Sequence, residues 1–161
     1  SVIPKFIEQI KSGKNITITD PSMTRFTITM DQALELILTA IKKGYGGEVF
    51  VPKLKAYRLD TLKDAILDIL KTSAEIEKIP VRHGEKYHES LINSEELRNS
   101  YETDNLYVIL DKQMHPTTFS KWNDLKKTSL KDQYSSDKVE ILTKEELIGI
   151  IIKVGLLTRN E

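Results

Sequence analysis

Apolar and polar positions follow two periods along the chain, and segments with each period alternate. Apolar residues spaced three and four apart predict amphipathic helices, whereas strict alternation and short apolar runs predict strands. The expected helices cover residues 2–11, 32–43, 61–70 and 147–157, with a short one from residue 94. The expected strands cover residues 15–19, 26–30, 48–51, 76–81 and 106–110. This order predicts a mixed α/β fold of short strands alternating with amphipathic helices.

Caps and stripes refine the expected helices. Asp31 and either Asp60 or Thr61 are expected N-caps, and residues 143–146 read as a capping box. The stripes at helical spacing are expected to lie in the core; they comprise Leu34, Ile37, Leu38 and Ile41 in one helix and Leu147, Ile150 and Ile151 in another.

The periodic pattern is lost between residues 111 and 137. This stretch holds Pro116 and the isolated aromatics Phe119, Trp122 and Tyr134, and it predicts a long irregular loop. Three aromatic side chains on a long loop make good anchors for a neighbouring subunit. The full-length protein is therefore expected to be a homo-oligomer.

Composition narrows the possible partners. The chain has 161 residues, with 24 basic and 24 acidic side chains and no cysteine. Balanced charge gives no global field for nucleic acid or an anionic membrane, and no apolar run approaches the roughly 20 residues of a membrane span. Absence of cysteine is compatible with a reducing compartment, so we expect a cytoplasmic protein. His83 and His88 are five apart and His115 stands alone, so no metal site is expected.

Two short basic motifs carry the candidate chemistry. They cover residues 20–26, with Arg25, and residues 82–86, with Arg82. An arginine fork stays charged and donates several hydrogen bonds in a fixed geometry, which suits a phosphate or diphosphate. A lone surface arginine is more often solvated or weakly paired. No glycine-rich loop opens a helix, so a dinucleotide cofactor site is not expected in this chain.

Five motifs in one order resemble a known family. They lie at residues 1–6, 18–26, 47–53, 82–86 and 134–137. Together they resemble the C-terminal part of bacterial UDP-N-acetylglucosamine 4,6-dehydratases, in particular the C5-inverting type of capsular polysaccharide biosynthesis. Members of the inverting subgroup have a histidine after the arginine, and His83 matches that position.

The resemblance implies a lyase of the extended short-chain dehydrogenase/reductase superfamily. Such an enzyme has a Rossmann half that binds NAD or NADP and a C-terminal part that binds the UDP-sugar. This chain resembles only the second part, so its Rossmann half is expected to be absent, no catalytic residue is assigned, and the chain alone is expected to be inactive. Residues 1–93 would form the UDP-sugar-binding region, and residues 94–161 a C-terminal extension with an irregular loop at 111–137 and a terminal helix within 143–157.

The resemblance also implies substrate-binding residues. Arg25 and Arg82 match positions that face the UDP diphosphate, and Glu85 matches a position suited to the ribose hydroxyls. The resemblance implies weaker assignments for other residues. Ile18 and Thr19 match the strand end whose backbone can read the uracil edge, and Ser1, Val2 and Ile3 lie on the segment that closes over the nucleotide. Lys53 would make a further phosphate or sugar contact.

Other interpretations stay open at this point. An epimerase or reductase of the same superfamily would bind the diphosphate through the same two arginines, because binding of the phosphates does not determine which reaction takes place at the sugar. A non-catalytic UDP-sugar-binding or assembly module is the alternative from a different class. If the chain is one half of an enzyme, an exposed apolar patch is expected along Val2, Ile3 and Phe6.

Overall fold

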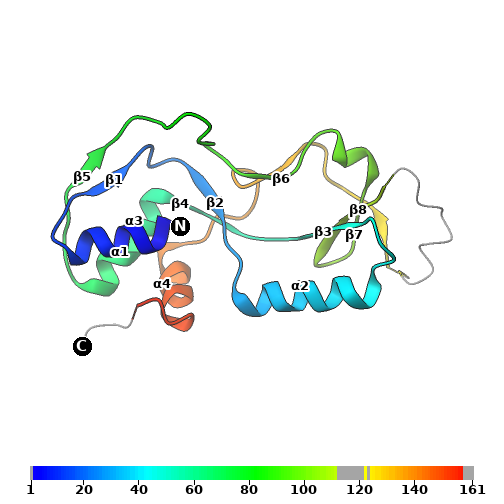
Figure 1. The fold of residues 1–161 in the computed structure, drawn as a ribbon, viewed down its shortest axis with the longest axis horizontal. Helices are drawn as coiled ribbons and strands as arrows, with labels where there is room; N and C mark the ends of the chain where they lie inside the picture. Colours follow the sequence, from blue (N-terminus) through cyan, green and yellow to red (C-terminus); the bar gives the residue numbers. More distant parts are fainter. Residues whose placement is uncertain (1, 112–121, 123, 158–161) are drawn as a thin grey trace. The chain divides into compact units, whose positions relative to one another are not determined.

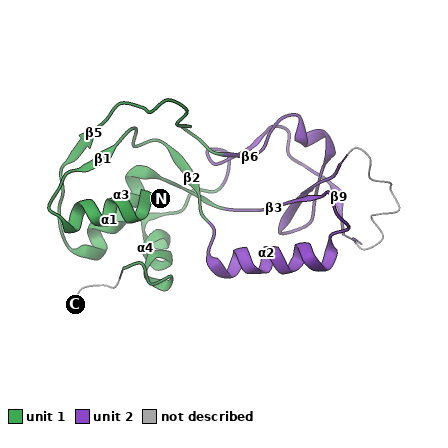
Figure 2. Ribbon diagram, in the orientation of Figure 1, with its two compact units in different colours: residues 1–27, 55–89, 140–161 green, residues 28–54, 90–139 purple. Residues whose placement is uncertain are grey.

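The computed structural model describes residues 2–111, 122 and 124–157, which form two compact units (Figure 2). Unit 1 comprises residues 1–27, 55–89 and 140–161, and unit 2 comprises residues 28–54 and 90–139. The expected boundary at residue 93 therefore falls inside unit 2, because the chain passes between the units several times. The mixed α/β class is confirmed.

The described residues of unit 1 form three helices and four short strands, which are labelled in Figure 1. They are α1 (Val2–Lys11), β1 (Ile16–Ile18), β2 (Thr24–Phe26), β4 (Ala56–Arg58), α3 (Leu59–Leu70), β5 (Ile76–Lys78) and α4 (Lys144–Lys153). Strands β1 and β5 pair in parallel, and β2 and β4 pair antiparallel. The two pairs form separate two-stranded sheets.

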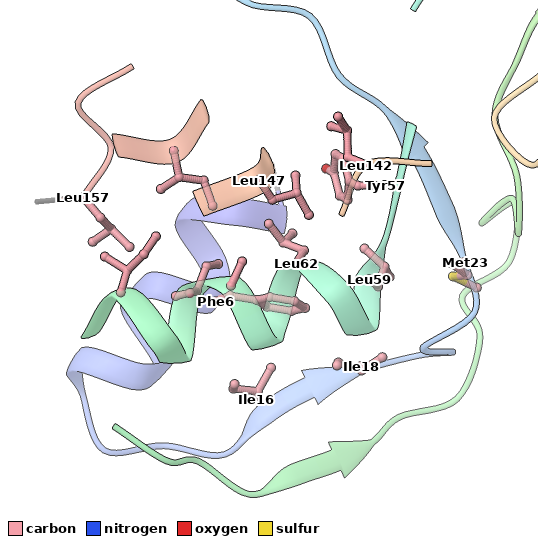
Figure 3. Packing of buried hydrophobic residues seen from close by; sticks show 14 residues of the cluster. Phe6, Ile16, Ile18, Met23, Tyr57, Leu59, Leu62, Leu142, Leu147 and Leu157 are labelled. Carbon is pink, nitrogen blue, oxygen red and sulfur yellow. The ribbon is translucent and has the colours of Figure 1, made fainter. Parts of the chain in front are cut away.

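The core of unit 1 is built around α3 (Figure 3). Leu62, Ala65 and Ile66 have no exposed surface, and they pack with side chains from α1, β1 and α4. Leu147 and Ile151 of α4 belong to this cluster, as expected, and Ile150 packs against it. The predicted capping box of α4 is also confirmed, since the Thr143 side chain accepts a hydrogen bond from the Glu146 amide and the Glu146 carboxylate accepts one from the Thr143 amide.

The apolar patch expected on α1 is not found there. Phe6 is buried, and Val2 and Ile3 are half-buried and pack against the same cluster. The apolar stripe of α1 faces α3 and β1 within unit 1, so that unit covers it.

The described residues of unit 2 form one long helix, a short 3-10 helix and short antiparallel strands. They are α2 (Met30–Lys43), β3 (Val49–Pro52), β6 (Ser90–Ile92), the 3-10 helix η1 (Glu96–Asn99), β7 (Ser100–Glu102), β8 (Leu106–Ile109), β9 (Lys126–Lys127) and β10 (Tyr134–Ser135). Four of the strands form a sheet in the order β3-β8-β7-β9, and β6 pairs with β10. Helix α2 contacts β3.

The apolar stripe of α2 is the largest departure from the sequence prediction. Leu34, Ile37, Leu38 and Ile41 were expected in the core, but between 51% and 72% of each side chain is exposed. No residue of α2 is buried. Its inward face instead carries residues that are only half-buried, namely Ala33, Leu36, Thr39, Ala40 and Lys43.

Several element boundaries also differ from the prediction. The strand expected at residues 26–30 is β2, which ends at Phe26, and Thr29 rather than Asp31 caps α2 through a capping box with Gln32. A threonine at the N-cap ends the extended backbone one turn before the apolar stripe begins. The expected strand at 76–81 is shorter, because β5 ends at Lys78.

Helix α3 begins at Leu59, before the expected caps. Its N-cap residue, Arg58, makes no side-chain capping bond. Asp60 lies in the first turn, where its carboxylate accepts hydrogen bonds from the Arg58 guanidinium and from the Thr61 amide. Packing of Leu59 and Leu62 in the core fixes this start more strongly than a cap does.

Two aromatic side chains expected as anchors for a neighbouring subunit are buried in unit 2. Trp122 stacks on Phe50 with ring centroids 5.7 Å apart, and the Tyr134 hydroxyl donates to the Leu54 carbonyl at 3.1 Å. Both side chains are less than 10% exposed, which corrects that expectation. Phe119 lies outside the described residues. Among the described residues, no helix is long and apolar enough to cross a membrane.

Candidate functional site

Unit 1 brings the two basic motifs together. Because β1 and β5 run in parallel, the segments that follow them leave from the same edge of the pair. The first segment turns at Asp20, whose carboxylate accepts hydrogen bonds from the Ser22 hydroxyl at 2.5 Å and the Ser22 amide at 2.8 Å. These two hydrogen bonds hold the pKa of Asp20 below its usual range, and the bond from the Ser22 hydroxyl has the larger effect. The second segment leads into the motif at residues 82–86.

Glu85 connects the two motifs. The Thr19 hydroxyl donates to both oxygens of the Glu85 carboxylate at 3.3 Å. The same carboxylate accepts the Arg82 amide at 3.2 Å, and the Glu85 amide donates to the Arg82 carbonyl at 3.0 Å. Gly84 has a φ of 80°, a conformation that favours glycine, so the tight turn suits this residue. Glu85 therefore fixes the turn and ties it to the end of β1.

Arg25 lies on β2, opposite Tyr57 of β4. Its Nη1 donates to the carbonyls of Thr24 at 2.8 Å and Tyr87 at 3.2 Å, and its Nε lies 3.7 Å from the Glu89 carboxylate. The side chain is 20% exposed. Burial raises the pKa of Tyr57, an effect that the nearby Arg25 charge opposes. The guanidinium is thus held in place before any ligand binds.

A third set of contacts runs beside Arg25. The Thr24 amide donates to the Tyr87 carbonyl at 3.1 Å, and the Thr24 hydroxyl lies 2.8 Å from Nδ1 of His88. Residues 85–89 therefore run along residues 19–25 at several points. Sequence reasoning missed Tyr87, His88 and Glu89. Tyr87 contributes a backbone carbonyl, which leaves no trace in residue type, whereas His88 and Glu89 contribute side chains whose partners lie more than 60 positions away in the sequence.

Arg82 differs from Arg25 in its environment. Its side chain is exposed, as are those of His83 and Lys86 in the same motif. The backbone of Arg82 is fixed by Glu85, while the exposed guanidinium can reach a ligand. Unit 1 thus presents one held and one exposed arginine on neighbouring segments.

The weaker assignments are placed as follows. The Ile18 side chain is buried, and its carbonyl accepts a hydrogen bond from the Ile79 amide at 3.0 Å. Thr19 is 7% exposed and uses its hydroxyl on Glu85. Ile3 is half-buried against the core, and Ser1 lies outside the described residues. Contact of these residues with a nucleotide stays a prediction.

Lys53 belongs to unit 2, whereas the other candidates belong to unit 1. Its Nζ bonds the Glu102 carboxylate at 2.8 Å and lies 4.9 Å from the Tyr107 ring centroid. Burial alone would raise the pKa of Glu102, but hydrogen bonds from Lys53 and Ser129 outweigh it and hold that pKa below its usual range. Burial raises the pKa of Tyr107 to about 12. Lys53 thus forms an ion pair within unit 2, and its contact with a phosphate or sugar stays a prediction.

We expect Glu102→Gln to destabilise the chain at neutral pH and to have little effect in acid. The folded-state pKa of Glu102 is depressed, so its stabilisation is fully present above the unfolded pKa of about 4.3 and is lost as the pH falls through the folded value. Urea unfolding of the unmutated chain and of the Glu102→Gln variant at pH 7 and pH 3 measures the difference in their free energies of unfolding. A destabilisation that is equally large at both pH values would contradict the ionic role of Glu102.

Unit 2 also has an open polar pocket of about 530 Å³ beside α2. Its lining includes Glu35, Lys43, Lys53, Asp104 and Asp124. Both signs of charge meet there, so the pocket has no preference for an anion. In the part of the chain that the structure describes, no three His, Asp or Glu side chains are grouped to hold a metal ion. His115 is not among those residues.

Comparison with known proteins identifies the family. Residues 1–111 match the family described as Polysaccharide biosynthesis protein. The chain belongs to this family. It is 38% identical over 154 residues to the UDP-glucose 4-epimerase of Rickettsia massiliae, a match that covers 94% of this chain and 45% of the relative. The UDP-glucose 4-epimerase of Rickettsia canadensis is 38% identical over 162 residues, covering 99% and 46%.

A solved structure shows the same fold. The X-ray structure of Pen from Bacillus thuringiensis superposes with a TM-score of 0.82 and 33% identity, over 98% of this chain and 46% of that one. The chain thus spans slightly under half the length of the relatives it matches. The match confirms membership of the polysaccharide biosynthesis family, and the Rickettsia relatives are named UDP-glucose 4-epimerases.

Proposed function

We propose that this chain is the UDP-sugar-binding portion of an NAD(P)-dependent nucleotide-sugar enzyme of the extended short-chain dehydrogenase/reductase superfamily. The observation that carries the proposal is the connection of the Arg25 and Arg82 motifs through Glu85 and Tyr87 at one edge of unit 1. Two arginines on neighbouring, hydrogen-bonded segments suit a diphosphate.

Each of the three residues has a distinct part in this proposal. Arg25 donates from a guanidinium that backbone carbonyls already orient, so less conformational freedom is lost on binding. Arg82 closes on the diphosphate from the turn. Glu85 keeps acceptor capacity beyond its bonds to Thr19 and the Arg82 amide, and this capacity suits the ribose hydroxyls.

We propose that the dinucleotide cofactor is not held by this chain. Gly44 follows the end of α2 instead of opening a helix, and a Cβ there would lie 2.6 Å from the Ala40 carbonyl oxygen, so this glycine serves the helix end. We therefore assign NAD or NADP to the part of the family fold that this chain does not span. The chain contributes orientation, since a grip on the remote UDP group aligns the reacting sugar.

The reaction has two candidates within the superfamily. The five motifs, with His83, favour a UDP-N-acetylglucosamine 4,6-dehydratase of capsular polysaccharide biosynthesis, which removes water from the sugar. The Rickettsia relatives favour an epimerase, which leaves the composition of the sugar unchanged. A non-catalytic UDP-sugar-binding module stays the alternative from another class.

Product mass separates these candidates. The chain, joined to the part of the Rickettsia massiliae relative that the match leaves uncovered, is incubated with NAD and either UDP-N-acetylglucosamine or UDP-glucose, and the products are separated from the substrate by chromatography before mass spectrometry. A product lighter by one water supports the dehydratase. An isomer of unchanged mass supports the epimerase, and absence of turnover with retained UDP-sugar binding supports the non-catalytic module.

A further inference from the structure

Helix α2 exposes its most apolar face. Met30, Leu34, Ile37, Leu38 and Ile41, which we call the α2 stripe, are each between 51% and 72% exposed. At about 100° per residue these five positions fall within an arc of roughly 100°, so they form one continuous face. The stripe contains no charged residue, and Asp31, Glu35 and Lys42 flank it.

An amphipathic helix usually packs its apolar face against the core, whereas α2 exposes that face. Its inward face toward β3 carries Ala33, Leu36, Thr39, Ala40 and Lys43, which are only half-buried. A soluble protein seldom leaves a contiguous apolar face of this kind uncovered. The arrangement therefore indicates that another polypeptide surface covers the stripe.

The strand next to α2 has an open side. β3 lies at the end of the order β3-β8-β7-β9, so among the described strands only β8 pairs with it. On this strand Val49 is 54% exposed. An edge strand can accept a further strand, and a sheet extended in this way carries apolar side chains that a helix can cover. An open edge and an uncovered helix face thus occur side by side in unit 2 (Figure 1).

We propose that the α2 stripe and the open edge of β3 form the docking surface for the remaining part of the family fold. The lengths of the matches support this occupant, because each match covers 94–99% of this chain but only 45–46% of the relative. The solved relative contains this fold with a TM-score of 0.82 and has about as much chain again beyond it. The inference depends on family membership and not on UDP binding.

Coexpression tests the docking surface. The chain is produced with the part of the Rickettsia massiliae relative that the match leaves uncovered, first as two polypeptides and then joined as one. Carbene footprinting with mass spectrometry measures the exposure of residues 30–41. We expect a one-to-one complex in which the α2 stripe is protected, and the same protection in the joined protein.

A matched pair of variants gives the specificity of the contact. Leu38→Asp is expected to weaken the complex at least ten-fold, whereas Leu156→Asp, which changes a leucine exposed to 44% in unit 1, leaves it unchanged. Because Leu38 is exposed, its variant should fold, and circular dichroism checks this. A stripe that stays labelled in the joined protein overturns the proposal, as does a homodimer of the chain alone with a protected stripe.

Discussion

Replacing Ile66 with alanine is expected to lower the free energy of unfolding by about 2–5 kcal/mol. Ile66 lies on α3 and has no exposed surface, and it packs in the cluster that joins α1, β1 and α4. The substitution removes buried apolar surface and leaves a cavity that the surrounding helices fill only partly. Urea denaturation followed by circular dichroism measures the loss.

Leu38→Ala is the matched control. It removes a similar volume from α2, but 55% of the leucine is already exposed. Surface substitutions away from special features change stability by about 0.5 kcal/mol or less, and alanine is a good helix former. Equal losses for Ile66→Ala and Leu38→Ala would contradict the assignment of the core to α3 and the exposed stripe to α2.

Removing both arginines is expected to weaken UDP binding by at least about 100-fold. A hydrogen bond to a charged group contributes about 1.5–3 kcal/mol, and about 1.4 kcal/mol corresponds to a ten-fold change in affinity. Arg25→Ala with Arg82→Ala deletes such bonds from both motifs. Isothermal titration with UDP measures the change.

Two further variants separate charge from geometry. Arg98→Ala removes an exposed arginine of unit 2 and should leave UDP affinity unchanged. Arg25→Lys keeps the charge but loses the planar fork that reaches the Thr24 and Tyr87 carbonyls, so it should recover only part of the affinity. Full recovery with lysine would mean that the fork geometry of Arg25 has no role.

Periodicity predicted the helices of unit 1 well, because their apolar faces are covered within the chain. α1 matches the expected residues 2–11, and α4 has the expected capping box and buried Leu147. The same reasoning misplaced the stripe of α2, since a pattern shows that a face needs cover but not which polypeptide supplies it. The prediction that Trp122 anchors a neighbouring subunit was wrong for the opposite reason, because Trp122 packs against Phe50 within unit 2.

The candidate site was predictable only in its side chains. Arg25, Arg82 and Glu85 lie in motifs whose residue types suggest an anion, and the structure connects those motifs. The Tyr87 carbonyl, which orients Arg25, could not be predicted, since any residue has such an acceptor. Lys53 also shows the limit, because a lysine beside a motif suits a phosphate and an ion pair with Glu102 equally well.

A comparison of UDP with uridine tests the central claim most directly. Both ligands carry the base and ribose, and only UDP carries the diphosphate that Arg25 and Arg82 are proposed to hold. Calorimetric titration of the chain should show UDP binding at least about ten-fold more tightly than uridine, with the difference lost in the double alanine variant. Equal affinity for UDP and uridine in the unmutated chain would contradict the account.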